Sequence, residues 1–170
     1  MAEQKQPTTP PSLVDRDFET KLDYLREYSE LYFPQLIYRR VKMTQPEMND
    51  YHREVDPSEV EYYGEINLFA FVQHDPTQKE LARYGIDEKR DVKLRIAMPV
   101  LIDSGLATQP DPPFGDITYL INPGDQFWFD GKLYKVLNWY RENYWGNTTY
   151  PLWITVFSEV RHPDVEDVQA

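Results

Sequence analysis

The stretch that decides the fold runs from Asn122 to Val160 and reads NPGDQFWFDGKLYKV, then LNWYRENYWGNTTY, then PLWITVFSEV. Apolar and aromatic side chains recur in it with the spacing of strands. The predicted strands cover residues 127–129, 133–140 and 152–160. Asp130-Gly131 joins the first two, because these residue types suit a tight hairpin whose two central positions need positive φ. A second reversal falls at 145–148, so the stretch predicts an antiparallel β-meander.

Upstream, the pattern predicts one long helix over about Asp17 to Phe33, which Pro34 ends. Phe18, Leu22 and Leu25 form its apolar stripe. The same spacing adds Tyr28, Leu31 and Tyr32 to that stripe. The helix therefore offers one broad face to a core.

Further strands and short helices are predicted between this helix and the meander. Strands are expected at 36–43, 66–73, 91–98 and 117–121, and helical turns at 77–84 and 100–104. The 66–73 strand is apolar on both faces, which favours a central position in a sheet. The long irregular connection 44–61 is typical of a functional or interface-forming loop, and 108–115 is a second, proline-rich loop. The fold class expected is mainly β with one long N-terminal helix, as a small antiparallel β-barrel or sandwich with long loops.

The domain organisation follows from composition. Residues 1–14 are polar and proline-rich and predict a flexible N-terminal arm. Residues 15–161 predict a single β-rich domain that includes the helix, and residues 162–170 an acidic tail. At 170 residues the chain is long enough for one sizeable core but short for two.

The net charge of −11 argues against a protein that grips phosphate backbones, because that affinity comes chiefly from Lys and Arg. An acidic wall would instead let DNA slide past. No apolar run approaches the ~20 residues of a membrane span, and no apolar segment follows Lys5 as in a secretory signal. We therefore expect a protein without a membrane role that folds in a cytoplasm.

Reactive side chains do not gather into a recognisable constellation. The chain has no cysteine, and His74-Asp75 precedes Pro76 at a strand end, which favours a turn over a metal site. The acids between Glu54 and Glu65 could serve acid–base chemistry but more simply form a solvated surface. The expectation is no catalytic, cofactor-binding or metal-binding residue, and no enzyme.

The segment from Lys79 to Arg95 is the richest in basic residues, including Arg83 and Arg90. Four acids between them leave a charge of about +2, which favours a salt-bridged contact between like subunits. A nucleic-acid-binding patch is the less favoured interpretation. Proteins that bind single strands interleave stacking aromatic residues with their basic residues, and this segment does not.

The ordered series of motifs resembles head–tail joining proteins of tailed bacteriophages, above all the neck or head-closure proteins of contractile-tailed phages. The motifs are Tyr63-Gly64-Glu65, Tyr84-Gly85-Ile86-Asp87, the Gly124-Asp125 turn with the Asp130-Gly131 hairpin and its Tyr134-Lys135-Val136 strand, and Glu142-Asn143-Tyr144-Trp145-Gly146. The resemblance covers about residues 60–160 and leaves the N-terminal helix and arm unmatched.

The resemblance implies a homo-oligomeric ring in the virion neck, assembled in the host cytoplasm. Its partners would be the portal or adaptor on one side and tail-side proteins on the other. Double-stranded DNA would pass without sequence-specific binding, and the ring could close the channel. The candidate contact residues are Tyr62, Tyr63, Arg83, Arg90, Asp130, Gly131, Tyr144, Trp145 and Asn147.

Two alternatives stay open. One is a structural protein of the tail or baseplate. The other is a small aromatic-lined β-barrel that binds carbohydrate, with stacking platforms at Trp128, Trp139, Trp145 and Tyr144.

Overall fold

A computed structural model describes residues 13–42, 60–109, 116–146, 148 and 150–161. Nearly all of the predicted arm, most of both irregular loops, the acidic tail and Asn147 lie outside these ranges. The described elements, in chain order, are α1 (Leu13–Tyr32), β1 (Gln35–Arg39), β2 (Ile66–Phe69), β3 (Phe71–His74), α2 (Gln78–Arg83), β4 (Val92–Ala97), α3 (Met98–Asp103), β5 (Ala107–Thr108), β6 (Thr118–Tyr119), β7 (Gln126–Phe129), β8 (Lys132–Tyr144) and β9 (Pro151–Val160).

The meander forms the middle of a seven-stranded antiparallel sheet with the order β2-β1-β7-β8-β9-β4-β3, and β5 and β6 form a second small sheet. Asp130 and Gly131 have φ values of 50° and 73°, as the tight hairpin requires. The prediction of a mainly β fold with one long N-terminal helix is confirmed. Strand β8 is longer than predicted and carries a bulge between Val136 and Asn138, where one extra residue bends the strand.

The prediction of a central strand at 66–73 is wrong. This stretch forms two strands, β2 and β3, which flank Ala70 and lie at opposite edges of the sheet. Strand β2 pairs only with β1, and β3 only with β4. The stretch is apolar on both faces, but only one face belongs to the core. Leu68 and Ala70 are fully buried there, whereas Phe71 is 44% exposed.

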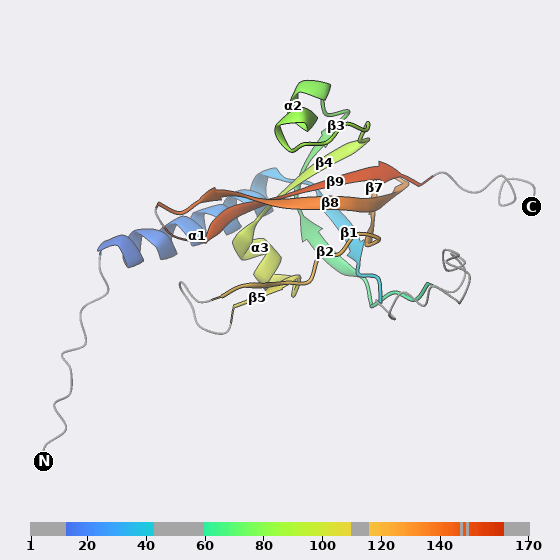
Figure 1. Cartoon of the computed structure of the whole chain (residues 1–170). Helices are drawn as coiled ribbons and strands as arrows, with labels where there is room; N and C mark the ends of the chain where they lie inside the picture. The colour runs from blue at the N-terminus through green and yellow to red at the C-terminus, as the bar shows by residue number, and fades with distance from the viewer. Residues whose placement is uncertain (1–12, 43–59, 110–115, 147, 149, 162–170) are drawn as a thin grey trace, which may run out of the picture.

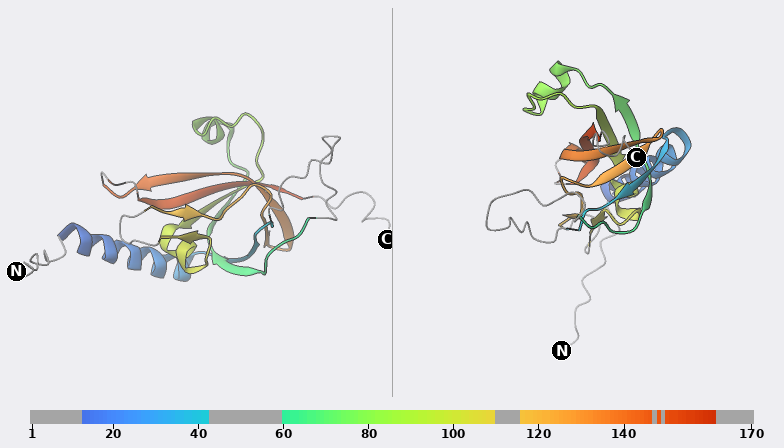
Figure 2. Two further views of the ribbon diagram at one scale, coloured as in Figure 1. Left: turned by 60° about the horizontal axis from the view of Figure 1, so that its bottom comes forward. Right: turned by 90° about the vertical axis from the view of Figure 1, so that its right-hand side faces the viewer.

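Because the two edge strands are successive parts of one chain, the sheet must curve until its ends approach each other. Figure 2 shows this curvature in the view from the side of the C-terminus. The sheet is nevertheless not closed into a barrel, so the barrel form of the prediction is wrong.

Helix α1 runs alongside the long β8–β9 hairpin in both Figure 1 and Figure 2. It contributes Phe18 and Leu25 to the core, where the Phe18 ring lies edge-on to Tyr150 with 4.8 Å between centroids. Helix α3 contacts α1 through an ion pair, with 2.6 Å between Arg26 Nε and Asp103 Oδ2. Figures 1 and 2 also show α2 outside the sheet, where its Leu81 packs with Ile86 and with Phe157 of β9 in a small second core.

A buried carboxylate fixes the turn that leads into β7. Asp125 is fully buried and accepts hydrogen bonds from the Tyr38 hydroxyl, from Val41 N at 2.8 Å and from Asn122 N at 2.9 Å. Burial raises the pKa of this carboxyl, while its hydrogen bonds act in the opposite direction. The Pro-Gly-Asp motif thus ties β1 to the start of the meander.

Candidate binding surfaces

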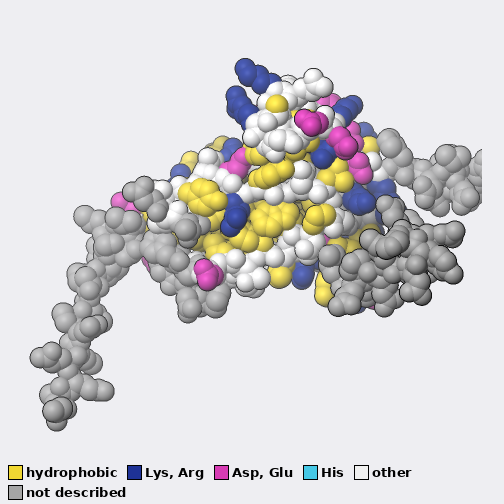
Figure 3. Space-filling view, in the orientation of Figure 1, with side chains coloured by type: hydrophobic (Ala, Val, Ile, Leu, Met, Phe, Trp, Pro, Cys, Tyr) yellow, Lys and Arg dark blue, Asp and Glu magenta, His cyan; other side chains and the backbone are white. Residues whose placement is uncertain are grey.

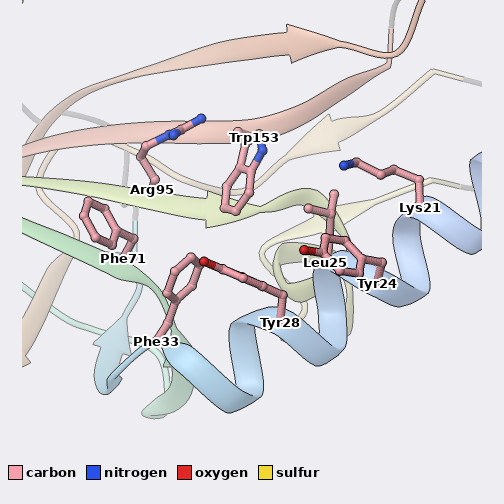
Figure 4. A pocket seen from close by; sticks show the side chains of 8 residues that line it. All are labelled: Lys21, Tyr24, Leu25, Tyr28, Phe33, Phe71, Arg95 and Trp153. Atoms are coloured by element: carbon pink, nitrogen blue, oxygen red, sulfur yellow. The ribbon is translucent and has the colours of Figure 1, made fainter.

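A largely apolar groove lies between α1 and the sheet, with a volume of about 400 Å³. Figure 4 shows its side chains rising from the helix on one side and from the strands on the other. We call it the α1 groove, and it is lined by Lys21, Tyr24, Leu25, Tyr28, Phe33, Phe71, Arg95 and Trp153.

The helical wall of the α1 groove continues a row of tyrosines spaced four residues apart. Residues at this spacing lie one above the other on a helix. Tyr28 stands with its ring centroid 5.8 Å from that of Tyr24 and 4.7 Å from that of Tyr32. The assignment of Tyr28, Leu31 and Tyr32 to a buried stripe was wrong, because these side chains are 36%, 75% and 70% exposed.

Aromatic rings also form the opposite wall. The Phe33 centroid lies 5.7 Å from Phe71 on β3 and 6.0 Å from Trp153 on β9. The guanidinium of Arg95 lies 4.8 Å from the Trp153 ring, and the Lys21 ammonium 5.3 Å from the Tyr24 ring. Two cations thus border an aromatic floor.

A second surface combines basic and aromatic side chains at the end of β1. The Arg39 guanidinium carbon lies 3.8 Å from the Tyr62 ring and 4.6 Å from the Trp128 ring. Arg40 lies 4.6 Å from the Tyr63 ring, which Lys42 also faces at 5.5 Å. We call these six residues the Arg39 cluster, and it contains the candidate residues Tyr62 and Tyr63.

The Asp130-Gly131 hairpin borders a shallower groove of about 340 Å³ that also contains Ile37, Trp128 and Phe129. Since Trp128 belongs to this groove and to the Arg39 cluster, two sets of candidate residues lie side by side. In the sequence, Tyr62 and Asp130 of these two sets are 68 residues apart.

The other candidates lie elsewhere. Arg83 is exposed in the last turn of α2, and Arg90 pairs with Glu88 at 3.7 Å. Figure 3 shows basic and acidic side chains mixed over α2, and an apolar band over β8 and β9. Tyr144 is exposed at the end of β8, whereas Trp145 is half-buried and packs against Phe18 at 5.7 Å.

The tryptophans proposed as carbohydrate platforms are half-buried, and each contacts another side chain of the fold. Trp128 lies under Arg39, Trp139 lies 5.0 Å from the Tyr119 ring, and Trp145 packs on α1. Trp153, which was not among them, is the tryptophan that lines the α1 groove. The strand assignment alone could not indicate this, because the groove exists only once α1 lies against β9.

Across the described ranges, no group of three His, Asp or Glu side chains lies close enough to hold a metal ion. No described helix is both long and apolar enough to cross a membrane. Searches against known protein families, curated proteins and solved structures gave no match.

Replacing Gly131 with Val should lower the free energy of unfolding by about 1–2 kcal/mol, the cost of a side chain in the left-handed region. Gly131 has φ +73°, and a Cβ atom there would meet nothing within 4 Å, so the loss reflects backbone strain alone. Urea denaturation measures it. Gly64→Val is the matched control, because that site is equally open without a positive φ. Equal losses at the two sites would contradict the hairpin geometry.

Stability should fall as pH rises from about 10 to 12. Burial, reinforced by its hydrogen bond to Glu142, raises the pKa of Tyr84 from 10.0 to about 12. The folded protein therefore keeps a proton that the unfolded chain loses near pH 10, so this contribution is complete below pH 10 and lost above. Urea midpoints measured across this range should decline less steeply in Tyr84→Phe. If the urea midpoint declined equally steeply with pH in the wild type and in Tyr84→Phe, the raised pKa of Tyr84 would not be the cause.

Proposed function

We propose that the protein is a structural component of the head-to-tail connector, or neck, of a contractile-tailed bacteriophage. In this role it forms a homo-oligomeric ring between the portal or adaptor and the tail-side proteins. The ring belongs to the virion and assembles in the host cytoplasm. Double-stranded DNA passes it without sequence-specific binding, and the ring can close the channel.

The observation that carries the proposal is the exposed aromatic face of α1. Tyr24, Tyr28, Leu31 and Tyr32 are all exposed on one helix, and Phe71 extends the same surface across the α1 groove. Monomeric proteins rarely expose contiguous apolar patches of this kind, and aromatic side chains are enriched in protein interfaces. This face therefore suits a lasting contact between subunits.

Two further features support a connector. The motif series over residues 60–160 resembles neck proteins, and its central hairpin has the geometry that the motif requires. The net charge of −11 disfavours adhesion of DNA to the ring. In the Arg39 cluster, the Arg39 guanidinium already has partners within the fold, so it is less available to a DNA phosphate. Its Nε donates a hydrogen bond to Gln126 at 3.0 Å, and the rings of Tyr62 and Trp128 lie beside it.

The solution mass of the purified protein, with electron microscopy of the same sample, tests the ring. The wild-type chain should give closed rings, and Tyr28→Ser with Tyr32→Ser should shift the mass toward the monomer. The matched control is Glu19→Ser with Glu30→Ser, which changes two exposed positions of the same helix outside the aromatic row. A wild-type monomer, or equal behaviour of the two double variants, would contradict the proposal.

A location in the tail or baseplate is the second candidate, because the same aromatic face would serve a ring at either end of a tail. The position of the protein on the virion separates the two.

A further inference from the structure

We propose that the α1 groove binds the proline-rich segment Pro7–Pro11 of a neighbouring copy of the same chain. This inference rests on the homo-oligomer of the proposed function and names the segment that links one subunit to the next.

The chemistry of the α1 groove fits an extended proline segment. Such segments favour the polyproline II conformation and dock in grooves lined by aromatic rings, since little conformational entropy remains to be lost. Here Tyr24 and Tyr28 line the helical side and Phe71 and Trp153 the strand side, as Figure 4 shows. Phe33 closes one end, with its ring 5.4 Å from that of Tyr28.

The borders of the groove suit the backbone of such a segment. Proline has no N–H group, so a proline segment offers mainly carbonyl oxygens as hydrogen-bonding groups. Lys21 and Arg95 carry several N–H donors each and no acceptor. The donors of the groove and the acceptors of the segment are therefore complementary.

The chain itself contains a segment of this kind. Residues 6–12 read QPTTPPS, in which Pro7 and Pro10 have the P-x-x-P spacing that aromatic grooves recognise. Pro11 follows directly. The segment has no large apolar side chain with which to pack on its own.

The geometry of α1 decides between the same chain and a neighbour. A helix rises about 1.5 Å per residue, so Lys21 lies about 12 Å and Tyr28 about 22 Å along the axis from Leu13. An extended chain spans at most about 3.5 Å per residue, so Pro10 reaches about 10 Å from Leu13. Pro7 of the same chain reaches about 21 Å, so the same chain can place only Pro7 well inside the groove. A neighbouring copy is free of this limit and can place Pro7, Pro10 and Pro11 in the groove together.

The test is titration of a fluorescently labelled peptide of residues 1–14 with the full chain, followed by fluorescence anisotropy. The acceptor carries Pro7→Ser, Pro10→Ser and Pro11→Ser, which removes competition from its own segment. We expect saturable binding of the natural peptide, and no binding of a peptide with the same three substitutions.

Adding Phe71→Ser to the acceptor should weaken binding about tenfold or more, as expected for loss of a central aromatic contact. Phe71 lies exposed on an edge strand, so the fold should tolerate the change. Tyr63→Ser, an exposed aromatic of the Arg39 cluster, is the control and should leave binding unchanged.

Absence of peptide binding, or equal binding by the acceptor with and without Phe71→Ser, would overturn the inference. The proposed function can fail separately. Wild-type rings without peptide binding would reject only this docking mode, whereas peptide binding by a chain that never forms rings would support the docking mode and reject the connector.

Discussion

Replacing Asp125 with Ala should lower the free energy of unfolding by about 3–6 kcal/mol, because it leaves three donors without their acceptor at an approximate cost of 1–2 kcal/mol each. The donors are the Tyr38 hydroxyl and the backbone N–H groups of Val41 and Asn122. Asp125, Tyr38 and Val41 are all buried, so water cannot readily replace the lost acceptor. Chemical denaturation followed by circular dichroism measures the loss.

Asp125→Asn is the matched control, since it keeps the shape and one acceptor oxygen. Oδ2 accepts from Tyr38 and Asn122, and Oδ1 accepts from Val41 N. An amide oriented to keep the first two bonds places an NH₂ group against the third donor. The loss should therefore be smaller than in Asp125→Ala. A change below about 1 kcal/mol for Asp125→Ala would show that the carboxylate does not hold β1 to the meander.

Phe18→Ala should also cost about 3–5 kcal/mol, the usual range for removing a buried phenylalanine. Phe18 is 1% exposed, and its ring packs edge-on against Tyr150 and also against Trp145. These contacts hold the N-terminal half of α1 against the connection between β8 and β9, which contains Trp145 and Tyr150. Hydrogen exchange should therefore quicken in that half of α1 first, in addition to the global loss seen in urea.

Leu31→Ala on the same helix is the control for Phe18→Ala. Leu31 is 75% exposed, so truncating it should change stability by no more than about 0.5 kcal/mol. Similar losses for the two variants would contradict the assignment of which face of α1 packs on the sheet.

Local signals were enough to predict the meander and the C-terminal end of α1, whereas the predicted start at Asp17 was wrong because α1 begins at Leu13. Asp130-Gly131 determines its hairpin through the backbone of two residues, and Pro34 ends α1 through a clash with its own neighbour. The Thr77 capping box likewise begins α2 through contacts within four residues. None of these features depends on how distant segments meet.

The edge position of the 66–74 stretch could not be predicted in the same way. Its apolar pattern shows that both faces are covered to some degree, but not how many neighbours each strand has. Whether β2 pairs with one strand or two depends on contacts with β1, more than 25 residues away in sequence. Similarly, the spacing of Tyr24, Tyr28 and Tyr32 shows that they share a face, not whether the sheet covers it.

The candidate contact residues likewise depend on contacts between distant segments, which the sequence alone does not reveal. Tyr62 and Tyr63 were expected at a subunit contact, and their cationic partners Arg39 and Arg40 became visible only in the folded chain. Trp145 is expected at a projecting contact, and in the fold it is half-buried and packs against Phe18 of α1. The α1 groove was missed altogether, because it combines residues of α1, β3, β4 and β9.

The position of the protein on the virion tests the central proposal most directly. The account requires that a phage encodes the chain. Purified particles of that phage would be labelled with gold-conjugated antibody against the protein and viewed by electron microscopy. The account predicts label at the junction between head and tail. Label at the distal end of the tail, or particles that carry none of the protein, would contradict it.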